Sequence, residues 1–353
     1  MTMNKILIIG GTGSWGQELT RQIFDNYSVS EIRIYSRGEH QQVEMARKFN
    51  DDRLKFIIGD IRDKKALNFA AEGVDYIFHL AALKHVPVCE KNPEEAIKTN
   101  IFGTLNAVEA AIENEVGNFV LVSTDKAVDP INVYGVSKSM AEKIVVNANL
   151  RNSKTKFKCI RGGNVLGTHG SVVPLFKKQI ETSNSVTITN TEMTRYLMTL
   201  KEAISLIFKA VNEALGGEIY VMKMPSINIL QLAKVMISEL GNNETKIHTI
   251  GIRPGEKIHE VLVSRYEAVR AYDSGKYYVI LPNIDMNSLY ENYSKKTPLL
   301  NEYNSLHNIY LNDNELKDLL KNDGWLNNKK IIDLEGYTKE ELLEYFKRER
   351  WMR

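Results

Sequence analysis

The sequence contains few cysteines, no long apolar run and no excess of either charge. Its two cysteines, Cys89 and Cys159, lie far apart, which indicates neither a disulfide framework nor a zinc site and is typical of a reducing compartment. No apolar stretch approaches the ~18 residues that a membrane-spanning helix needs. The 46 Lys and Arg against 44 Asp and Glu leave no basic excess to neutralise phosphates. We therefore expect no metal, no membrane partner and no nucleic-acid partner.

The remaining composition is that of an ordinary globular protein. Of the 353 residues, 43% are hydrophobic and 25% are charged, which excludes a disordered or collagen-like chain. The length exceeds one minimal domain and suits one large α/β unit with an appended lobe. The first residues lead directly into a strand-like run and show no signal peptide. We expect a cytoplasmic protein and a homo-oligomer.

The first half of the chain alternates short apolar runs with helical patterns. The expected strands are Lys5–Ile9, Glu31–Tyr35, Leu54–Ile58, Asp75–Leu80, Asn118–Val122 and Lys156–Ile160. The expected helices between them include Lys64–Ala71, Pro93–Asn114 and Tyr134–Asn149. Nearly continuous apolar strands in such an alternation indicate a parallel sheet covered on both faces. The pattern predicts a doubly wound α/β domain of the Rossmann type over residues 1–163.

The regular alternation of strands and helices ends after about Gly163. Short strands at Val186–Thr189, Glu218–Met222 and Ile247–Ile250 mix with helices near Ser226–Leu240 and His259–Glu267. This mixture predicts a smaller α/β lobe over residues 164–290, from which we expect later segments to return to the sheet. Residues 291–353 form a polar C-terminal extension. We expect it to end in a helix that begins with a capping box of Thr338 and Glu341.

A glycine-rich turn joins the first strand to the first helix. The run Gly10-Gly-Thr-Gly13-Ser-Trp-Gly16 permits a tight turn and close approach to a pyrophosphate, and the helix N-terminus attracts the anion. Its GxxGxxG spacing is the form found in extended short-chain dehydrogenase/reductase enzymes. The predicted dinucleotide contacts are Gly10, Thr12, Gly13, Ser14, Trp15 and Gly16, with Asp60 and Ile61 at the adenine and Leu80, Ala81 and Ala82 beside the cofactor.

The end of the second strand indicates which dinucleotide binds. NAD-specific sites need a carboxylate there to hold the ribose 2′-OH. This chain has Ser36 and Arg37 instead, and a guanidinium with a hydroxyl suits a 2′-phosphate. We predict NADP as the cofactor. If Arg37 is only a solvated loop charge, NAD would fit as well.

Tyr134 and Lys138 stand four residues apart, which places both side chains on one face of a helix. They follow the strand end at Ser123 and Thr124, at the carboxyl edge of the sheet where ligands bind. A neighbouring ammonium favours the phenolate, so Tyr134 would take a proton from an alcohol as a hydride leaves, while Lys138 would hold the nicotinamide ribose. The pattern predicts a catalytic pair; a surface pair without a role is the alternative.

Several further segments, together with those above, carry a specific resemblance. The chain is similar over about residues 4–285 to the UDP-N-acetylglucosamine 4,6-dehydratases of the extended short-chain dehydrogenase/reductase superfamily. The likeness is to the C5-inverting type of the pseudaminic-acid pathway and to related capsule-synthesis enzymes. The matching segments are Gly10–Ser14, Ala81–His85, Ser123–Ala127, Tyr134–Lys138, Arg161–Asn164, Gly170–Pro174, Glu192–Arg195 and Arg253–Lys257.

The resemblance implies a redox-neutral elimination on a UDP-sugar. A hydride would pass from C4 to NADP, the C5 proton and the C6 hydroxyl would leave, and the hydride would return to C6. In the family the Asp of the Thr-Asp-Lys motif acts at the C6 hydroxyl and the Lys acts at C5; these roles fall on Asp125 and Lys126, beside Thr124. A buried Lys near another cation would have a pKa lowered towards neutrality. An ion pair is the alternative, but adjacent residues do not normally face each other.

The resemblance also implies substrate contacts in the smaller lobe. Asn164 and Arg253 would hold the diphosphate, Arg195 would lie near the nucleotide, and Glu256 is placed with them. A fixed guanidinium is what a diphosphate calls for, which supports Arg253 independently. The sugar pocket would be lined by Lys84 and His85, although a lone His is more often a structural hydrogen-bonding group.

Two departures leave the stereochemistry at C5 open between inversion and retention. The tail is longer than in the inverting type, and the capsule-synthesis relatives often have Met where this chain has Tyr134. A nucleotide-sugar epimerase would share the cofactor site and the Tyr134 and Lys138 pair but would need no acid at C6, so Asp125 argues against it. A non-catalytic, NADP-sensing regulator typically loses the pair that this chain keeps.

Overall fold

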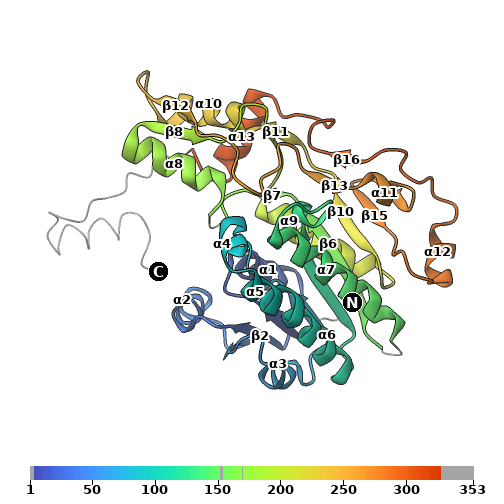
Figure 1. Cartoon of the computed structure of the whole chain (residues 1–353). Coiled ribbons are helices and arrows are strands. Elements are labelled where there is room, and N and C mark those ends of the chain that lie inside the picture. Colours follow the sequence, from blue (N-terminus) through green and yellow to red (C-terminus); the bar gives the residue numbers. More distant parts are fainter. Residues whose placement is uncertain (1–3, 152–153, 169, 327–353) are drawn as a thin grey trace, which may run out of the picture.

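The computed structural model describes residues 4–151, 154–168 and 170–326. Its centre is a nine-stranded sheet of order β14-β15-β10-β6-β5-β4-β1-β2-β3 (Figure 1). Seven strands are parallel: β1 (Lys5–Ile9), β2 (Glu31–Ser36), β3 (Leu54–Ile58), β4 (Tyr76–His79), β5 (Asn118–Thr124), β6 (Lys156–Gly162) and β10 (Ile219–Met222). At one edge, β15 (Tyr277–Ile280) runs antiparallel to β10 and to β14 (Ala271–Asp273). The predicted parallel α/β sheet is confirmed.

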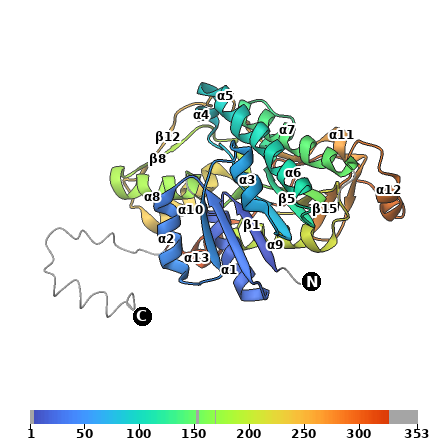
Figure 2. The same ribbon diagram turned by 90° about the horizontal axis from the view of Figure 1, so that it is seen from below.

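Helices cover both faces of this sheet, as Figure 2 shows. One face carries α1 (Ser14–Asn26), α2 (Glu39–Phe49) and α9 (Leu200–Glu213). The other face carries α3 (Lys64–Ala71), α6 (Gly103–Glu113) and α7 (Val133–Asn147), which is followed by the short η3 (Ala148–Leu150). Strand residues such as Ile8, Phe78 and Val120 are fully buried between the two layers, which is why these strands are apolar throughout.

The predicted helix Pro93–Asn114 is interrupted. It consists of α5 (Pro93–Ala96), a wider π-helical turn η1 (Ile97–Phe102) and α6, and it is preceded by α4 (Val86–Lys91). Asn100 lies buried in the wide turn, where its side chain hydrogen-bonds the backbone N–H and C=O of Leu83. The interruption therefore fixes the loop that follows β4, in keeping with the frequent use of such turns at functional sites.

A smaller lobe stands over the carboxyl edge of the sheet (Figure 1). One of its sheets contains β7 (Asn164–Val165), β9 (Thr194–Met198) and β11 (Ser226–Asn228), and a second pairs β8 (Ser185–Ile188) with β12 (Lys246–Thr249). The helices α8 (Val172–Ser183), α10 (Ile229–Leu240) and α13 (Asp313–Asn322) pack around its separate apolar core. The predicted helix near Ser226 begins later because Asn228 caps α10 by accepting from the N–H groups of Leu230 and Gln231.

The strand expected at Glu218–Met222 is β10. It lies in the large sheet beside β6 and is one of the later segments expected to return to that sheet. A helix assignment nearby was wrong. The helix expected over His259–Glu267 is instead β13 (Val261–Val263) followed by the one-turn α11 (Arg265–Ala268), which Ser264 caps. In both cases the deciding contact is a strand distant in the sequence, because β13 pairs with β16 (Tyr303–Asn304) of the tail.

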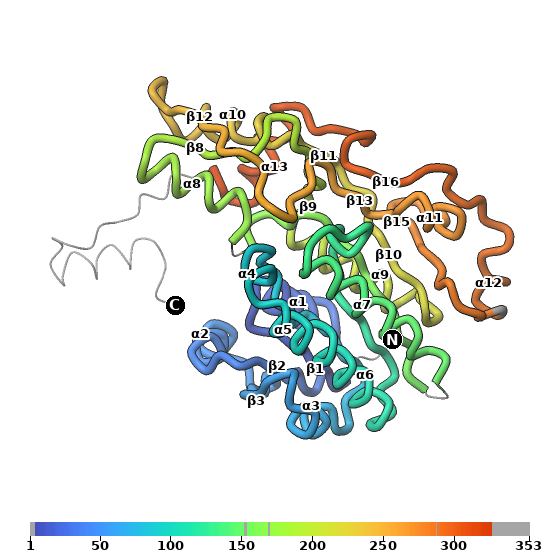
Figure 3. The backbone as a smooth tube through the Cα atoms, viewed as in Figure 1, coloured from blue at the N-terminus to red at the C-terminus, as the bar shows by residue number. Residues whose placement is uncertain are grey.

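The described part of the tail packs against both parts of the molecule. After α12 (Asn287–Tyr293) it forms β16 and then α13, whose Leu316 and Leu320 are buried in the smaller lobe (Figure 3). The helix predicted from the capping box of Thr338 and Glu341 lies outside the described residues. Within the described ranges, no helix is long and apolar enough to cross a membrane.

Candidate active site

The turn after β1 is shaped for close approach of another group. Gly10 has a φ of +83°, and a Cβ there would lie 2.7 Å from the backbone nitrogen of Ala81. Helix α1 begins after Gly13, and no described side chain caps its N-terminus. The N-terminus of a helix attracts an anion through its first N–H groups and its dipole. The turn and the helix end together fit a pyrophosphate.

The predicted cofactor residues line two adjoining hollows at the carboxyl edge of the sheet. The first is lined by Gly10, Thr12, Gly13, Ser36, Arg37, Asp60, Ile61, Leu80, Ala81 and Ala82. The second is lined by Gly10, Gly13, Ser14, Trp15, Gly16, Leu80, Ala82, Thr124, Tyr134 and Lys138. The structure thus gathers every residue of this prediction along one continuous cleft.

The end of β2 is electrically positive. Ser36 closes the strand, and Arg37 follows with a side chain that is 60% exposed. The guanidinium of Arg37 lies 3.9 Å from the carboxylate of Asp60, which Arg62 holds at 2.6 Å through several hydrogen bonds. Because Asp60 is already paired with Arg62, the Arg37 guanidinium remains available to a ligand.

The Thr-Asp-Lys motif forms a tight cluster at the end of β5. The Oγ1 of Thr124 donates to Oδ1 of Asp125 at 2.8 Å, and Nζ of Lys126 donates to the same oxygen at 3.0 Å. The expectation that Asp125 and Lys126 would not face each other is wrong, because the short 3₁₀ turn η2 (Asp125–Ala127) lets the Lys side chain fold back. Asp125 is 1% exposed and lies directly behind Thr124 and Lys126, which line the cleft. Its Oδ2 has no partner within the described residues.

Helix α7 presents Tyr134 and Lys138 to the same cleft. The Nζ of Lys138 donates to the carbonyl of Val122 at 2.8 Å, and burial lowers the pKa of Lys138 to about 8. Burial raises the pKa of Tyr134 to about 12, against the opposing effect of the Lys126 ammonium. In the protein without cofactor, Tyr134 is therefore protonated at neutral pH. The cation that acts on Tyr134 is Lys126 from the neighbouring turn.

Lys126 lies between two carboxylates. Its Nζ is 3.0 Å from Oδ1 of Asp125 and 3.6 Å from Oε1 of Glu260, which stands just before β13. Burial disfavours the ammonium, but Asp125 and Glu260 outweigh this effect and raise the pKa of Lys126. The expectation of a lowered pKa is therefore wrong. Sequence reasoning missed Glu260 because no spacing relates it to the Thr-Asp-Lys motif.

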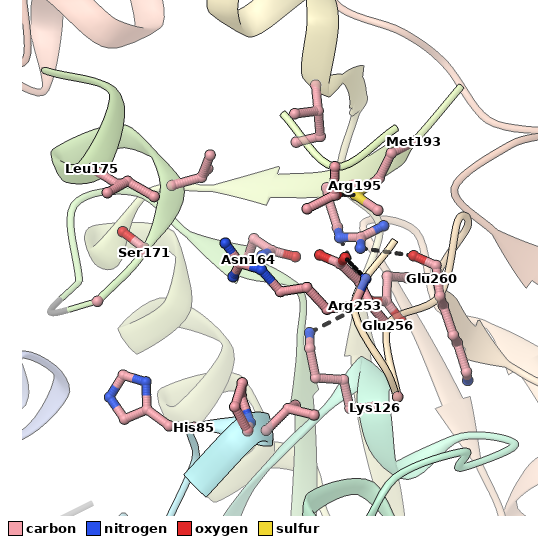
Figure 4. A pocket seen from close by; sticks show the side chains of 18 of the residues that line it. His85, Lys126, Asn164, Ser171, Leu175, Met193, Arg195, Arg253, Glu256 and Glu260 are labelled. Atoms are coloured by element: carbon pink, nitrogen blue, oxygen red, sulfur yellow. Dashed lines mark hydrogen bonds and ion pairs between the residues drawn. The ribbon is translucent and has the colours of Figure 1, made fainter. Parts of the chain in front are cut away.

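A third hollow lies between η2 and the smaller lobe (Figure 4). It contains every residue predicted to bind substrate: Lys84, His85, Asn164, Arg195, Arg253 and Glu256, together with Lys126 and Glu260. It shares Lys126 and Asn164 with the cofactor cleft. The Oδ1 of Asn164 is buried without a partner among the described residues, as is suitable for a ligand-binding group.

Arg195 is held differently from the expectation of a nucleotide contact. Its guanidinium donates to the carbonyls of Thr194, Lys257 and Ile258, and its Nε lies 3.6 Å from Oε1 of Glu260. These bonds fasten residues 257–260 to β9. Arg195 therefore lines the hollow chiefly as the group that holds this segment.

A buried network that sequence reasoning missed joins α7 to β6 and to α11. Arg161 on β6 forms two hydrogen bonds with Glu142 at 2.9 and 2.7 Å and two with Glu267 at 2.9 and 2.8 Å. It also donates to the carbonyl of Leu262. Glu142 lies one helical turn after Lys138, so the network ties the helix that carries the Tyr/Lys pair to β13 and α11.

Comparisons with known proteins support the motif resemblance. A UDP-N-acetylglucosamine 4,6-dehydratase (inverting) of Campylobacter jejuni is 43% identical over 284 residues, which cover 80% of this chain and 84% of that protein. A UDP-glucose 4-epimerase of Rickettsia felis is 42% identical over 327 residues, which cover 90% of this chain and 95% of that one. The solved structure of Pen from Bacillus thuringiensis has a TM-score of 0.86 and 36% identity, covering 92% of this chain and 99% of its own.

The resemblance to the 4,6-dehydratases noted from the motifs is thereby confirmed. The family described as polysaccharide biosynthesis proteins matches residues 6–282, the range that contains the whole cofactor cleft and the hollow beside it. On this match and on the identities to its relatives, the chain belongs to the polysaccharide biosynthesis protein family.

Proposed function

We propose that this protein is an NADP-dependent UDP-N-acetylglucosamine 4,6-dehydratase. Its product would be a UDP-4-keto-6-deoxy-N-acetylhexosamine for surface glycan or nonulosonic acid biosynthesis. The observation that carries the proposal is the cluster of Thr124, Asp125 and Lys126 at the junction of the cofactor cleft and the substrate hollow, beside Tyr134. A reaction that only moved a hydride at C4 would not require an acid and a base at this place.

The residues of the cleft fit NADP. The uncapped start of α1 and the turn at Gly10 would hold the pyrophosphate, and Ser36 with Arg37 would hold the 2′-phosphate. Lys138 would hold the nicotinamide ribose. When bound, the cofactor would accept a hydride from C4 of the sugar and return it at C6. Among the residues that end β2 none is acidic, which supports NADP over NAD.

Tyr134 would take the proton of the C4 hydroxyl as C4 is oxidised. The Lys126 ammonium lowers the pKa of this phenol, and the Thr124 hydroxyl that hydrogen-bonds it acts in the same direction. Both groups thus help Tyr134 against the burial that keeps it protonated in the protein alone. Tyr134 would therefore accept the proton of a sugar hydroxyl that reaches the junction of the cofactor cleft and the substrate hollow.

Asp125 and Lys126 would carry out the elimination. Once C4 is a ketone, the amine of Lys126 takes the C5 proton, and the electrons of the C5–H bond form the C5–C6 double bond as the C6–O bond breaks. Asp125 gives its proton to the departing hydroxyl, which leaves as water. When the hydride returns to C6, C5 takes up a proton and the 4-keto-6-deoxy sugar is complete. The hydrogen bond between the two side chains allows the resting proton to move from Lys126 to Asp125, which supplies a neutral base and a protonated acid together.

The test is to incubate the purified protein with NADP and UDP-N-acetylglucosamine and to measure the product mass. Loss of one water with deuterium incorporation at C5 in deuterated water is the expected result, and the ring couplings then report the configuration at C5. The relative named as inverting supports inversion. Tyr134→Phe should lower turnover by about 10²–10⁴-fold while NADP binding persists. A parent protein that binds both ligands yet forms no dehydrated sugar would contradict the proposal.

The second candidate is a nucleotide-sugar 4-epimerase. It is favoured by the Rickettsia felis relative, which is named as an epimerase and is similar over 90% of the chain. An epimerase would give a product of unchanged mass. Asp125→Asn separates the two: it should abolish dehydration but have little effect on epimerisation, because epimerisation needs no acid at C6.

A further inference from the structure

Glu260 is a buried carboxylate that the reaction described above does not yet use. It is 1% exposed and lines the substrate hollow. Its Oε1 lies 3.6 Å from Nζ of Lys126 and 3.6 Å from Nε of Arg195, and its Oε2 has no partner within the described residues. A carboxylate without full pairing at such burial is costly, so its position beside Lys126 requires an explanation.

Hydrogen bonds hold the backbone of Glu260 in place. The N–H of Glu260 donates to Oγ of Ser305 at 2.9 Å, and the N–H of Ser305 donates to the carbonyl of Glu260 at 2.8 Å. The Ser305 hydroxyl also hydrogen-bonds Thr194, next to Arg195, at 2.7 Å. Figure 4 shows the Glu260 and Arg195 side chains side by side above Lys126. The tail and β9 therefore fix Glu260 before any ligand arrives, as electrostatic preorganisation requires.

We propose that Glu260 is a positioning residue that orients Lys126 and stabilises the ammonium that forms when Lys126 takes the C5 proton. This inference rests on the proposed function. In the proton transfer the C5–H bond breaks, an N–H bond forms and positive charge develops on Nζ. An opposite charge within about 4–6 Å stabilises a charged group by the equivalent of 1–3 pKa units. The neutral amine of Lys126 is thereby made a stronger base.

A purely structural role is the competing explanation, since Glu260 also faces Arg195. The two roles predict different pH profiles. The active pair of Asp125 and Lys126 must share one proton, and turnover falls at alkaline pH when that proton is lost. Removing the charge of Glu260 makes the proton easier to lose, so the alkaline limb should move to lower pH. If Glu260 had only a structural role, its replacement would change the stability of the fold and would leave the alkaline limb of the pH profile in place.

Other charged and titratable groups surround Asp125 and Lys126. None of these groups is changed in the Glu260 variants that are compared with the parent protein. Asp125 lies on η2, Tyr134 on α7 and Arg195 on β9. The remaining groups lie on the segment before β13 and across the hollow, and they are His259, Lys257, Lys84, His85, Arg253 and Glu256. The charged groups with the largest effects on Lys126 are Asp125, Glu260 and Arg195. No step of the reaction uses Glu260 or Arg195 directly, and of these two only Glu260 is a carboxylate that stabilises the ammonium.

The experiment compares Glu260→Gln with Glu260→Asp and with Glu181→Gln, an exposed carboxylate on α8. Turnover and C5 deuterium incorporation are followed from about pH 7 to about pH 11.5 with UDP-N-acetylglucosamine and NADP, because the ordinary pKa of a Lys is about 10.4 and that of Lys126 is raised. Glu260→Gln should move the alkaline limb of kcat down by about one pH unit with little change in KM. Glu260→Asp should reverse much of this shift, and Glu181→Gln should match the parent.

A second measurement separates failure of this inference from failure of the proposed function. The Lys126 side chain is titrated by ¹⁵N NMR in the protein without substrate, with Lys126→Arg used to assign the signal. Glu260→Gln should lower the titration midpoint by about one unit or more. If the parent forms no dehydrated product, the proposed function fails while this titration still reports on the pair. An unchanged midpoint or an unshifted alkaline limb in Glu260→Gln would overturn the inference; if that variant does not fold, the same criteria apply to Glu260→Asp.

Discussion

Replacing Arg161 by Met should destabilise the fold strongly, because it removes the buried guanidinium that two carboxylates share. The guanidinium holds Glu142 and Glu267 through four hydrogen bonds, and the side chains of Arg161 and Glu142 are each only 4% exposed. Removing one partner of a buried ion pair typically costs about 3–5 kcal/mol, because a charge remains buried without compensation. Arg161→Met leaves Glu142 and Glu267 without the guanidinium that they share, and Glu267 keeps only the more distant Arg270 as a cation, at 4.0 Å.

The pKa of Glu267 gives an independent magnitude for the expected loss of stability. Burial raises this pKa, but Arg161 outweighs burial and lowers it to about 2. A difference of about 2.5 units from the ordinary value of a Glu corresponds to about 3 kcal/mol. Because the folded-state pKa is lowered, this stabilisation is fully present above about pH 4.5 and is lost as the pH falls towards 2. We therefore expect the variant to be less stable by about 3–5 kcal/mol at neutral pH, and the difference to shrink below about pH 4.5.

Urea unfolding at several pH values measures this difference. The matched control is Arg53→Met, because Arg53 also holds a carboxylate, that of Asp51, through two hydrogen bonds but is 41% exposed. Its loss should cost less than about 1 kcal/mol. The free energy of unfolding of Arg161→Lys should lie between that of the parent and that of Arg161→Met. A neutral-pH loss for Arg161→Met no larger than that of the Arg53 control would refute the reasoning.

Three further predictions concern the cofactor cleft. Gly10→Ala should weaken NADP binding at least about tenfold, because its Cβ would lie 2.7 Å from a backbone nitrogen at a φ of +83°; cofactor titration by fluorescence measures this. Arg37→Ala should weaken NADP binding about tenfold or more in calorimetry and leave NAD binding unchanged, and an equal loss for both would argue against a 2′-phosphate contact. Lys138→Met should abolish turnover yet raise the free energy of unfolding by on the order of 1–3 kcal/mol at neutral pH. Burial lowers the pKa of Lys138 to about 8, so the folded protein carries a cost below that pH which disappears as the pH approaches about 10; a thermal midpoint below that of the parent would contradict this.

The sequence allowed prediction of those features that depend on neighbouring residues. The parallel strands were correctly placed because each is a short apolar run between helices, and the cofactor cleft followed from the turn at Gly10. In a parallel sheet the strand ends meet at one edge, so the residues that follow several strands come together there. This is why Arg37, Asp60 and Tyr134 could be assigned to one cleft without a structure.

Features that depend on distant strands could not be read in this way. The local pattern of β10 fits either lobe, and β13 is extended because a strand from the tail pairs with it. The same reason explains the error on Lys126. Its charge depends on Glu260, which the chain brings to the site through β13 and Ser305. Sequence reasoning therefore placed Asp125 and Lys126 at the cleft but did not anticipate the charges around them.

The path of the chain has a consequence for how the protein is made. The large sheet receives β6 before the smaller lobe begins, but its remaining strands, β10, β15 and β14, come from residues 219–280. During synthesis the edge of β6 must therefore stay unpaired while residues 163–218 leave the ribosome. Open strand edges favour association with other chains, so this interval is the period of greatest exposure to aggregation. Neither lobe is continuous in sequence, and the two must be completed together.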